Sequence, residues 1–112
     1  MQIEHETIGD VMLLTATEPR LNAAGAVAFK DSVRAAAQDH GGRVVLDMTR
    51  VEFLDSSGLG ALVAVMKLLP GRRLELAGCG PVVGKVLALT KMDRVFVLHA
   101  DRDAALARRD AA

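Results

Sequence analysis

Hydrophobic and polar positions along the chain switch repeatedly between the spacing of strands and the spacing of helices. Residues 3–8 and 11–17 predict two strands, and Gly9-Asp10 between them is typical of a tight hairpin turn. Apolar residues then recur at helical spacing, with Asn22 as the predicted N-cap and Gly41-Gly42 as the predicted end of this helix. Ala26, Phe29, Val33 and Ala37 fall on one face of this helix.

The rest of the chain repeats this alternation. Residues 43–48 (RVVLDM) form a short run with β-branched residues, typical of a central strand that is covered on both faces. An apolar run from Leu59 to Leu69 predicts a second helix, and Pro70-Gly71 predicts its end. The remaining predicted elements are a strand at 73–77, a helix from Pro81 to about Leu89, a strand at 95–98 and a short helix capped by Asp101.

The predicted order of elements is therefore ββαβαβαβα. Strands that alternate with helices indicate an α/β fold, here with a mixed, mostly parallel sheet of about five strands and about four helices. With 112 residues, we expect a single domain over 1–112 with its core at about 3–107. Apolar residues make up 51% of the chain and aromatic residues only 3%, so this core must consist mainly of Val, Leu, Ala and Met.

Charge and cysteine content exclude several classes of protein. Fourteen basic and fourteen acidic residues cancel, and a neutral chain with few aromatic residues is poorly suited to nucleic acid. The single cysteine, Cys79, excludes a disulfide scaffold, and we expect it to be a small packed side chain. Glu4 and Glu6 stand where a signal peptide would be basic, which favours a cytoplasmic protein without membrane insertion. Three scattered histidines predict no metal site, and no cofactor is expected.

Candidate chemistry concentrates in residues 54–60 (LDSSGLG), between the central strand and the second helix. Asp55 or Ser56 can cap this helix, which would leave Ser57 in the first turn with an accessible hydroxyl. Gly58 would leave that hydroxyl uncrowded. Gly60 costs about 1 kcal/mol relative to Ala inside a helix, so we expect close packing at that position.

A phosphoryl group on Ser57 would add a charge of about −1.5 to −2. The N-terminus of a helix is a favourable place for negative charge, so the fold would tolerate the modification. A partner fitted to the small, neutral surface around Ser57 would instead lose contact. The segment therefore predicts a binding switch.

Two catalytic interpretations fit less well. Residues 78–85 (GCGPVVGK) are superficially like a phosphate-binding loop, but Cys79 and Val86 replace residues that the Walker pattern requires. Ser57, Asp93 and His99 follow the chain order of an α/β-hydrolase triad, but the Gly-x-Ser-x-Gly nucleophile elbow is absent. A small serine hydrolase is therefore kept only as an outside alternative.

Two long stretches carry a family resemblance. VVLDMTRVEFLDSSGLGALV at 44–63 and LELAGCGPVVGKVLALTKMDRVFVLHADRDAAL at 74–106 resemble the STAS domain over about residues 3–107. Bacterial anti-sigma factor antagonists and the cytoplasmic tails of sulfate transporters share this fold. The resemblance implies a non-enzymatic anti-sigma factor antagonist that binds an anti-sigma factor which is also a serine kinase. The kinase would hold the ATP, and a metal-dependent serine phosphatase would reverse the modification.

The resemblance also assigns roles to individual residues. Ser57 would be the phosphorylated residue, with Ser56 as the alternate, and Asp55 would support the loop and kinase docking. The implied partner surface includes Leu21, Asn22, Gly58, Leu59 and Gly60. Many antagonists carry Asp where this chain has Asn22, which keeps the cap but lacks the charge. A transporter or signalling accessory that works without phosphorylation remains the main alternative, and a weak homodimer is left open.

Overall fold

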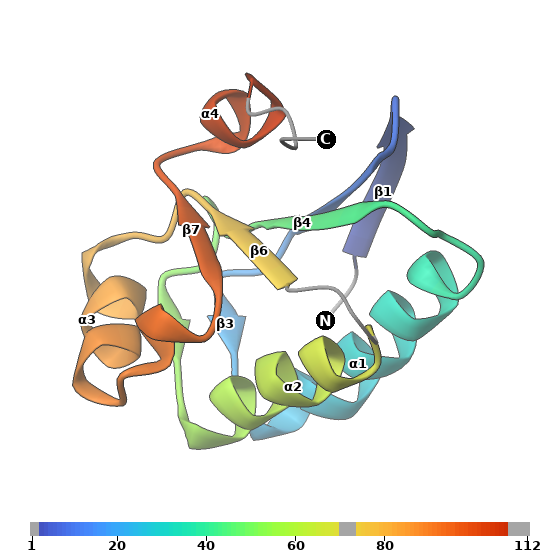
Figure 1. Ribbon diagram of the computed structural model, residues 1–112. Coiled ribbons are helices and arrows are strands. Elements are labelled where there is room, and N and C mark those ends of the chain that lie inside the picture. Colours follow the sequence, from blue (N-terminus) through green and yellow to red (C-terminus); the bar gives the residue numbers. More distant parts are fainter. Residues whose placement is uncertain (1–2, 70–73, 108–112) are drawn as a thin grey trace.

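The computed structural model describes residues 3–69 and 74–107, and a five-stranded sheet forms its centre (Figure 1). The strand order is β1-β2-β4-β6-β7. Strands β1 and β2 are antiparallel, and the other three pairings are parallel, as the alternation of elements predicts. The strands are β1 (Ile3–Ile8), β2 (Val11–Ala16), β4 (Arg43–Asp47), β6 (Leu74–Ala77) and β7 (Val97–His99).

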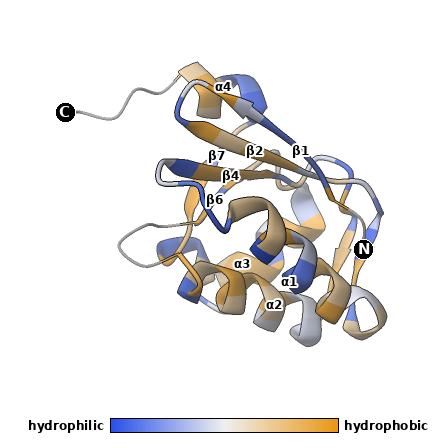
Figure 2. Ribbon diagram, turned by 90° about the vertical axis from the view of Figure 1, so that its right-hand side faces the viewer, coloured by the Kyte–Doolittle hydropathy of each residue, from blue (hydrophilic) through white to orange (hydrophobic). Residues whose placement is uncertain are grey.

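The helices cover the two faces of the sheet unequally. Three of them pack on one face and the short α4 on the other, as Figures 1 and 2 show. Apolar stripes on the three helices meet the sheet, whose central leucines Leu14, Leu46 and Leu76 are fully buried. The helices are α1 (Ala23–Ala37), α2 (Ser56–Lys67), α3 (Pro81–Leu89) and α4 (Arg102–Ala107). The α/β fold with mixed sheet and four helices is thus confirmed among the described residues.

Several predicted boundaries differ from the structure. The first helix ends at Ala37, four residues before Gly41-Gly42, which lie in the following loop. The last strand covers Val97–His99, because the backbone N–H groups of Val95 and Phe96 bond to the carbonyl of Met92. Those two residues extend the short 3₁₀ helix η1 (Met92–Arg94), which the sequence analysis missed. The predicted stop at Pro70-Gly71 lies outside the described residues.

A second, two-stranded parallel sheet was not predicted. Strand β3 (Arg20–Leu21) immediately precedes α1, and β5 (Phe53–Leu54) immediately precedes α2. Two residues are too short to show the period-2 pattern of a strand. This small sheet nevertheless sets where both helices begin.

A buried ionic cluster ties α4 to its face of the sheet. The Arg43 guanidinium donates to both carboxylate oxygens of Glu75, at 2.8 and 2.6 Å, and also to the Ala105 carbonyl at 3.0 Å. The His99 Nε2 lies 2.7 Å from Glu75 Oε1. Burial alone would raise the pKa of Glu75, but the hydrogen bonds from Arg43 and His99 outweigh it and hold the pKa below its ordinary value.

This cluster predicts a loss of stability in acid. A carboxyl group whose pKa is lowered by folding stabilises the fold above its ordinary pKa of 4.5, and that contribution disappears as the pH falls through the folded pKa. We expect the free energy of unfolding, measured by urea denaturation and circular dichroism, to fall below about pH 4.5. The Glu75→Gln variant should be less stable than the wild-type protein at pH 7. Its free energy of unfolding should also fall less on acidification. Equal losses in both proteins would show that Glu75 is not responsible.

Candidate functional site

The small sheet brings the N-termini of α1 and α2 side by side. Its register pairs Leu21 with Leu54, so the next residues, Asn22 and Asp55, are the N-caps of neighbouring helices. The Asp55 N–H lies 3.4 Å from the Leu21 carbonyl oxygen, which continues the contact between the two segments. Each helix N-terminus carries a partial positive charge from its free N–H groups. Two such termini therefore converge at one surface.

Backbone hydrogen bonds fix the loop that leads into β5. The Pro19 carbonyl accepts from the N–H groups of Glu52 and Phe53, at 2.7 and 3.0 Å. Leu21 and Leu54 are buried beneath this connection. The start of α2 is consequently held by the segment that precedes α1. This segment lies more than 30 residues earlier in the chain.

Asp55 caps α2 as predicted. Its Oδ1 accepts from the backbone N–H of Gly58 at 2.8 Å. Ser56 and Ser57 then occupy the first two positions of the helix, and both side chains are exposed. Among the described residues, neither hydroxyl has a hydrogen-bond partner. The Ser57 hydroxyl is thus accessible at a positive helix end.

Gly58 is required because the backbone of Leu21 approaches it closely. The predicted reason, that Gly58 leaves the Ser57 hydroxyl uncrowded, is not what the position requires. Gly58 is buried, and a Cβ built on it would lie 2.1 Å from the Leu21 carbonyl oxygen. No side chain fits at that distance without moving α2 away from β3. The glycine therefore allows the two helix starts to meet.

The close packing predicted for Gly60 is wrong. Gly60 is exposed, and a Cβ there would meet nothing within 4 Å. Leu59, its neighbour, is half-buried and packs against the core on the helix-covered face. The first exposed turn of α2 therefore presents the two serines and the bare backbone of Gly60.

Asn22 occupies the N-cap position of α1, but its side chain makes no capping hydrogen bond. The sequence analysis expected it to keep the cap. Its φ of −132° and ψ of −175° are extended, as at an ordinary N-cap, so the helix starts where predicted. The amide is half-buried beside an open hollow of about 500 Å³ that Pro19 and Arg20 also line.

Arg20 and Phe53 also lie at this surface, and neither was predicted to do so. The Arg20 guanidinium lies over the Phe53 ring, 5.2 Å from its centroid, which is within range of a cation–π contact. Phe53 is 39% exposed, whereas the other two phenylalanines, Phe29 and Phe96, are buried. An aromatic residue two positions before Asp55, in a chain with almost no aromatic residues, was the available signal. An exposed aromatic ring on the strand that leads into α2 is suited to contact with a protein partner.

The alternative chemistries find no support in the geometry. His99 lies on the α4 side of the sheet with Glu75, whereas Ser57 lies in the first turn of α2, which packs on the opposite side. Gly78, at φ 73°, makes the turn between β6 and α3. Burial, together with the nearby Asp47 carboxylate, raises the pKa of the Cys79 thiol to about 11, so the thiol is protonated at neutral pH.

The fold and the order of its elements are those of a known domain family. The profile of the STAS domain family matches residues 2–105, and the chain belongs to this family. It is 36% identical, over 56 residues, to a STAS-domain-containing protein of Pseudomonas aeruginosa (strain UCBPP-PA14). That match covers 48% of this chain and 55% of the relative, so it spans about half of the relative's length.

Solved structures of anti-sigma factor antagonists are similar over nearly the whole chain. A crystal structure from Thermotoga maritima, described as a candidate antagonist, is 26% identical with a TM-score of 0.83. It covers 93% of this chain and 91% of its own. An anti-sigma factor antagonist from Mycobacterium paratuberculosis is 28% identical with a TM-score of 0.79, and the match covers 97% of this chain and 94% of that one.

None of the helices within 3–69 and 74–107 is long and apolar enough to cross a bilayer.

Proposed function

We propose that this chain is an anti-sigma factor antagonist whose binding surface is controlled by phosphorylation of Ser57. The observation that carries the proposal is the exposed Ser57 hydroxyl, at the second position of α2, beside the N-terminus of α1. The similarity of the chain to the candidate antagonist of Thermotoga maritima and to the antagonist of Mycobacterium paratuberculosis supports the same function.

The unmodified surface suits a protein partner. Ser56, Ser57 and Gly60 are small and uncharged, and Leu59 and Phe53 supply apolar area around them. Asp55 is held by its capping bond to Gly58, so the loop is ordered before a partner arrives. A preordered surface loses less conformational entropy on binding. In this proposal, the partner is an anti-sigma factor that is also a serine kinase.

The site also suits transfer of a phosphoryl group to Ser57. The partner kinase would bind ATP and supply the catalytic residues, because this chain contributes only the acceptor hydroxyl. The bond between the γ-phosphorus and its bridging oxygen breaks, ADP leaves, and the Ser57 oxygen bonds to phosphorus after losing its proton to the kinase. The product places about two negative charges beside the Asp55 carboxylate. A metal-dependent serine phosphatase would restore the hydroxyl by hydrolysis.

Two consequences follow for the place and mode of action. The chain would act in the cytoplasm, where its kinase and ATP are found, and it would not itself be an enzyme. Asn22 stands where many antagonists carry Asp, so we propose that kinase recognition here relies more on Asp55 and on the Arg20–Phe53 pair.

Mapping the phosphorylated residue tests the proposal. Incubation with ATP and a serine kinase of the anti-sigma type from the source organism should add one phosphoryl group to the wild-type protein. Tandem mass spectrometry should place it on Ser57. Ser57→Ala should abolish incorporation, and the matched variant Ser56→Ala should retain it. Incorporation that persists in Ser57→Ala would refute Ser57 as the switch, and a wild-type protein that no such kinase modifies would favour the accessory role without phosphorylation.

A further inference from the structure

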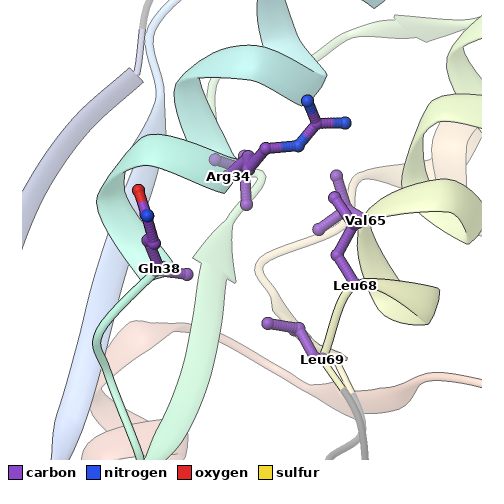
Figure 3. Close-up of a pocket in the computed structure, with 7 residues that line it drawn as sticks. Arg34, Gln38, Val65, Leu68 and Leu69 are labelled. Carbon is purple, nitrogen blue, oxygen red and sulfur yellow. The ribbon is translucent and has the colours of Figure 1, made fainter.

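A hollow of about 240 Å³ opens between the C-terminal halves of α1 and α2, away from the start of α2 where Ser57 lies (Figure 3). Five of its seven lining residues are aliphatic, and two are polar. The lining residues are Val33, Arg34 and Ala37 of α1 with its C-cap Gln38, and Val65 of α2 with the two residues that follow this helix, Leu68 and Leu69.

The sequence of α1 explains the hollow. Phe29 is fully buried and fills the space beneath α1 two turns earlier. At Ala37 the same face of the helix carries only a methyl group, which leaves a gap toward Val65 and Leu69. The hollow is open to solvent on one side, so an apolar group seated in it would leave water for contact with these side chains. The gap is therefore a place where an added apolar group would gain contacts.

The floor of the hollow is apolar. Val33, Val65 and Leu69 are at most 3% exposed, and none of them offers a polar atom from its side chain. The volume here would hold about eight water-sized groups, at about 30 Å³ each. This suits a short alkyl chain.

The rim carries a cation. Arg34 reaches from α1 toward α2, as Figure 3 shows, and its side chain is 61% exposed. Its ion pair with Asp31 is long, at 3.9 Å, and joins two exposed groups on the same helix, so it holds the guanidinium weakly. Within residues 3–69 and 74–107, no acidic side chain lines the hollow. The charge of Arg34 is thus available to an anionic group at the mouth.

We propose that this hollow binds a straight-chain carboxylate of about eight carbons, with the alkyl chain between α1 and α2 and the carboxylate on Arg34. The apolar floor favours the alkyl chain, and the Arg34 guanidinium at the rim favours the carboxylate. This site does not depend on the proposed function of Ser57, because it involves different residues at the other end of α2.

Titration with sodium octanoate, followed by the methyl NMR signals of Val33, Val65 and Leu69, tests the proposal on the full chain. We expect saturable shifts of these signals. Hexanoate should bind about fifteenfold more weakly, because each buried methylene contributes about fourfold. Arg34→Gln should weaken octanoate binding about two- to fivefold. Ala37→Leu should abolish it by filling the hollow.

Arg50→Gln is the matched control. Arg50 is also 61% exposed and also has a carboxylate at 3.9 Å, but it pairs with Glu4 on β1. This variant should bind octanoate as the wild-type protein does. Absence of saturable shifts would overturn the proposal, as would shifts spread equally over the exposed Val82 and Leu89. Equal affinity in Arg34→Gln and Arg50→Gln would overturn the role of the carboxylate, whatever the folding of Ala37→Leu.

Discussion

Replacing Gly58 by alanine is expected to destabilise the protein by about 2–3 kcal/mol. The new methyl group would lie 2.1 Å from the Leu21 carbonyl oxygen. That neighbour is backbone, held between Asp55 and the small β3–β5 sheet, so it cannot rotate away as a flexible side chain would. Either α2 moves outward or the small sheet opens. Both changes would disturb the surface around Ser57.

Gly60→Ala is the matched control for this prediction. The same substitution, two residues later in the same helix, adds a methyl group that meets nothing within 4 Å. Alanine is favoured over glycine inside a helix, so this variant should gain about 0.5–1 kcal/mol. Urea denaturation followed by circular dichroism measures both values, since the chain has no Trp or Tyr for fluorescence. Similar effects at the two positions would contradict the close approach of α2 to β3.

Phosphorylation of Ser57 is expected to weaken partner binding at least about 100-fold while the fold remains intact. Close to a positive helix end, the added charge is tolerated or slightly stabilising, at about 0.3–1 kcal/mol. At the interface the same charge would require desolvation, and it would face the Asp55 carboxylate within one turn. The first effect acts on the folding equilibrium, and the second acts on the binding equilibrium. Phosphorylation should therefore lower the affinity for the partner without lowering the free energy of unfolding.

Asp substitutions provide a first measurement of this separation. Ser57→Asp should reduce affinity for the anti-sigma factor, although by less than a full phosphate, and should leave the unfolding temperature within a few degrees. Val82→Asp is the matched control, because Val82 is also exposed at the second position of a helix, α3. It should change neither quantity appreciably. A Ser57→Asp protein that binds as tightly as Val82→Asp would contradict the switch.

Local signals explain the parts of the fold that could be predicted. The Gly9-Asp10 hairpin, the order of strands and helices, and the Asp55 cap depend on residues close together in the chain. The β3–β5 pairing was missed because each strand has only two residues and gains its partner through the tertiary fold. Helix α1 ends before Gly41-Gly42 because the helical spacing of apolar residues stops at Ala37.

The roles of the two glycines in α2 could not be separated from sequence. Gly58 and Gly60 lie in the same helix, and helix propensity treats them alike. What distinguishes them is the carbonyl of Leu21, which comes 37 residues earlier in the chain and approaches only Gly58. The hollow beside Ala37 was missed for the same reason, since an alanine on the buried face of a helix does not reveal what stands opposite.

The most direct test of the account compares the protein with and without phosphate on Ser57 in one titration against its anti-sigma factor. Calorimetry would measure the affinity of each form, and thermal unfolding of the same samples would measure stability. We expect binding by the unmodified protein, loss of at least about 100-fold in affinity on phosphorylation, and nearly equal unfolding temperatures. Equal affinities of the two forms, or a phosphorylated protein that fails to fold, would contradict this expectation.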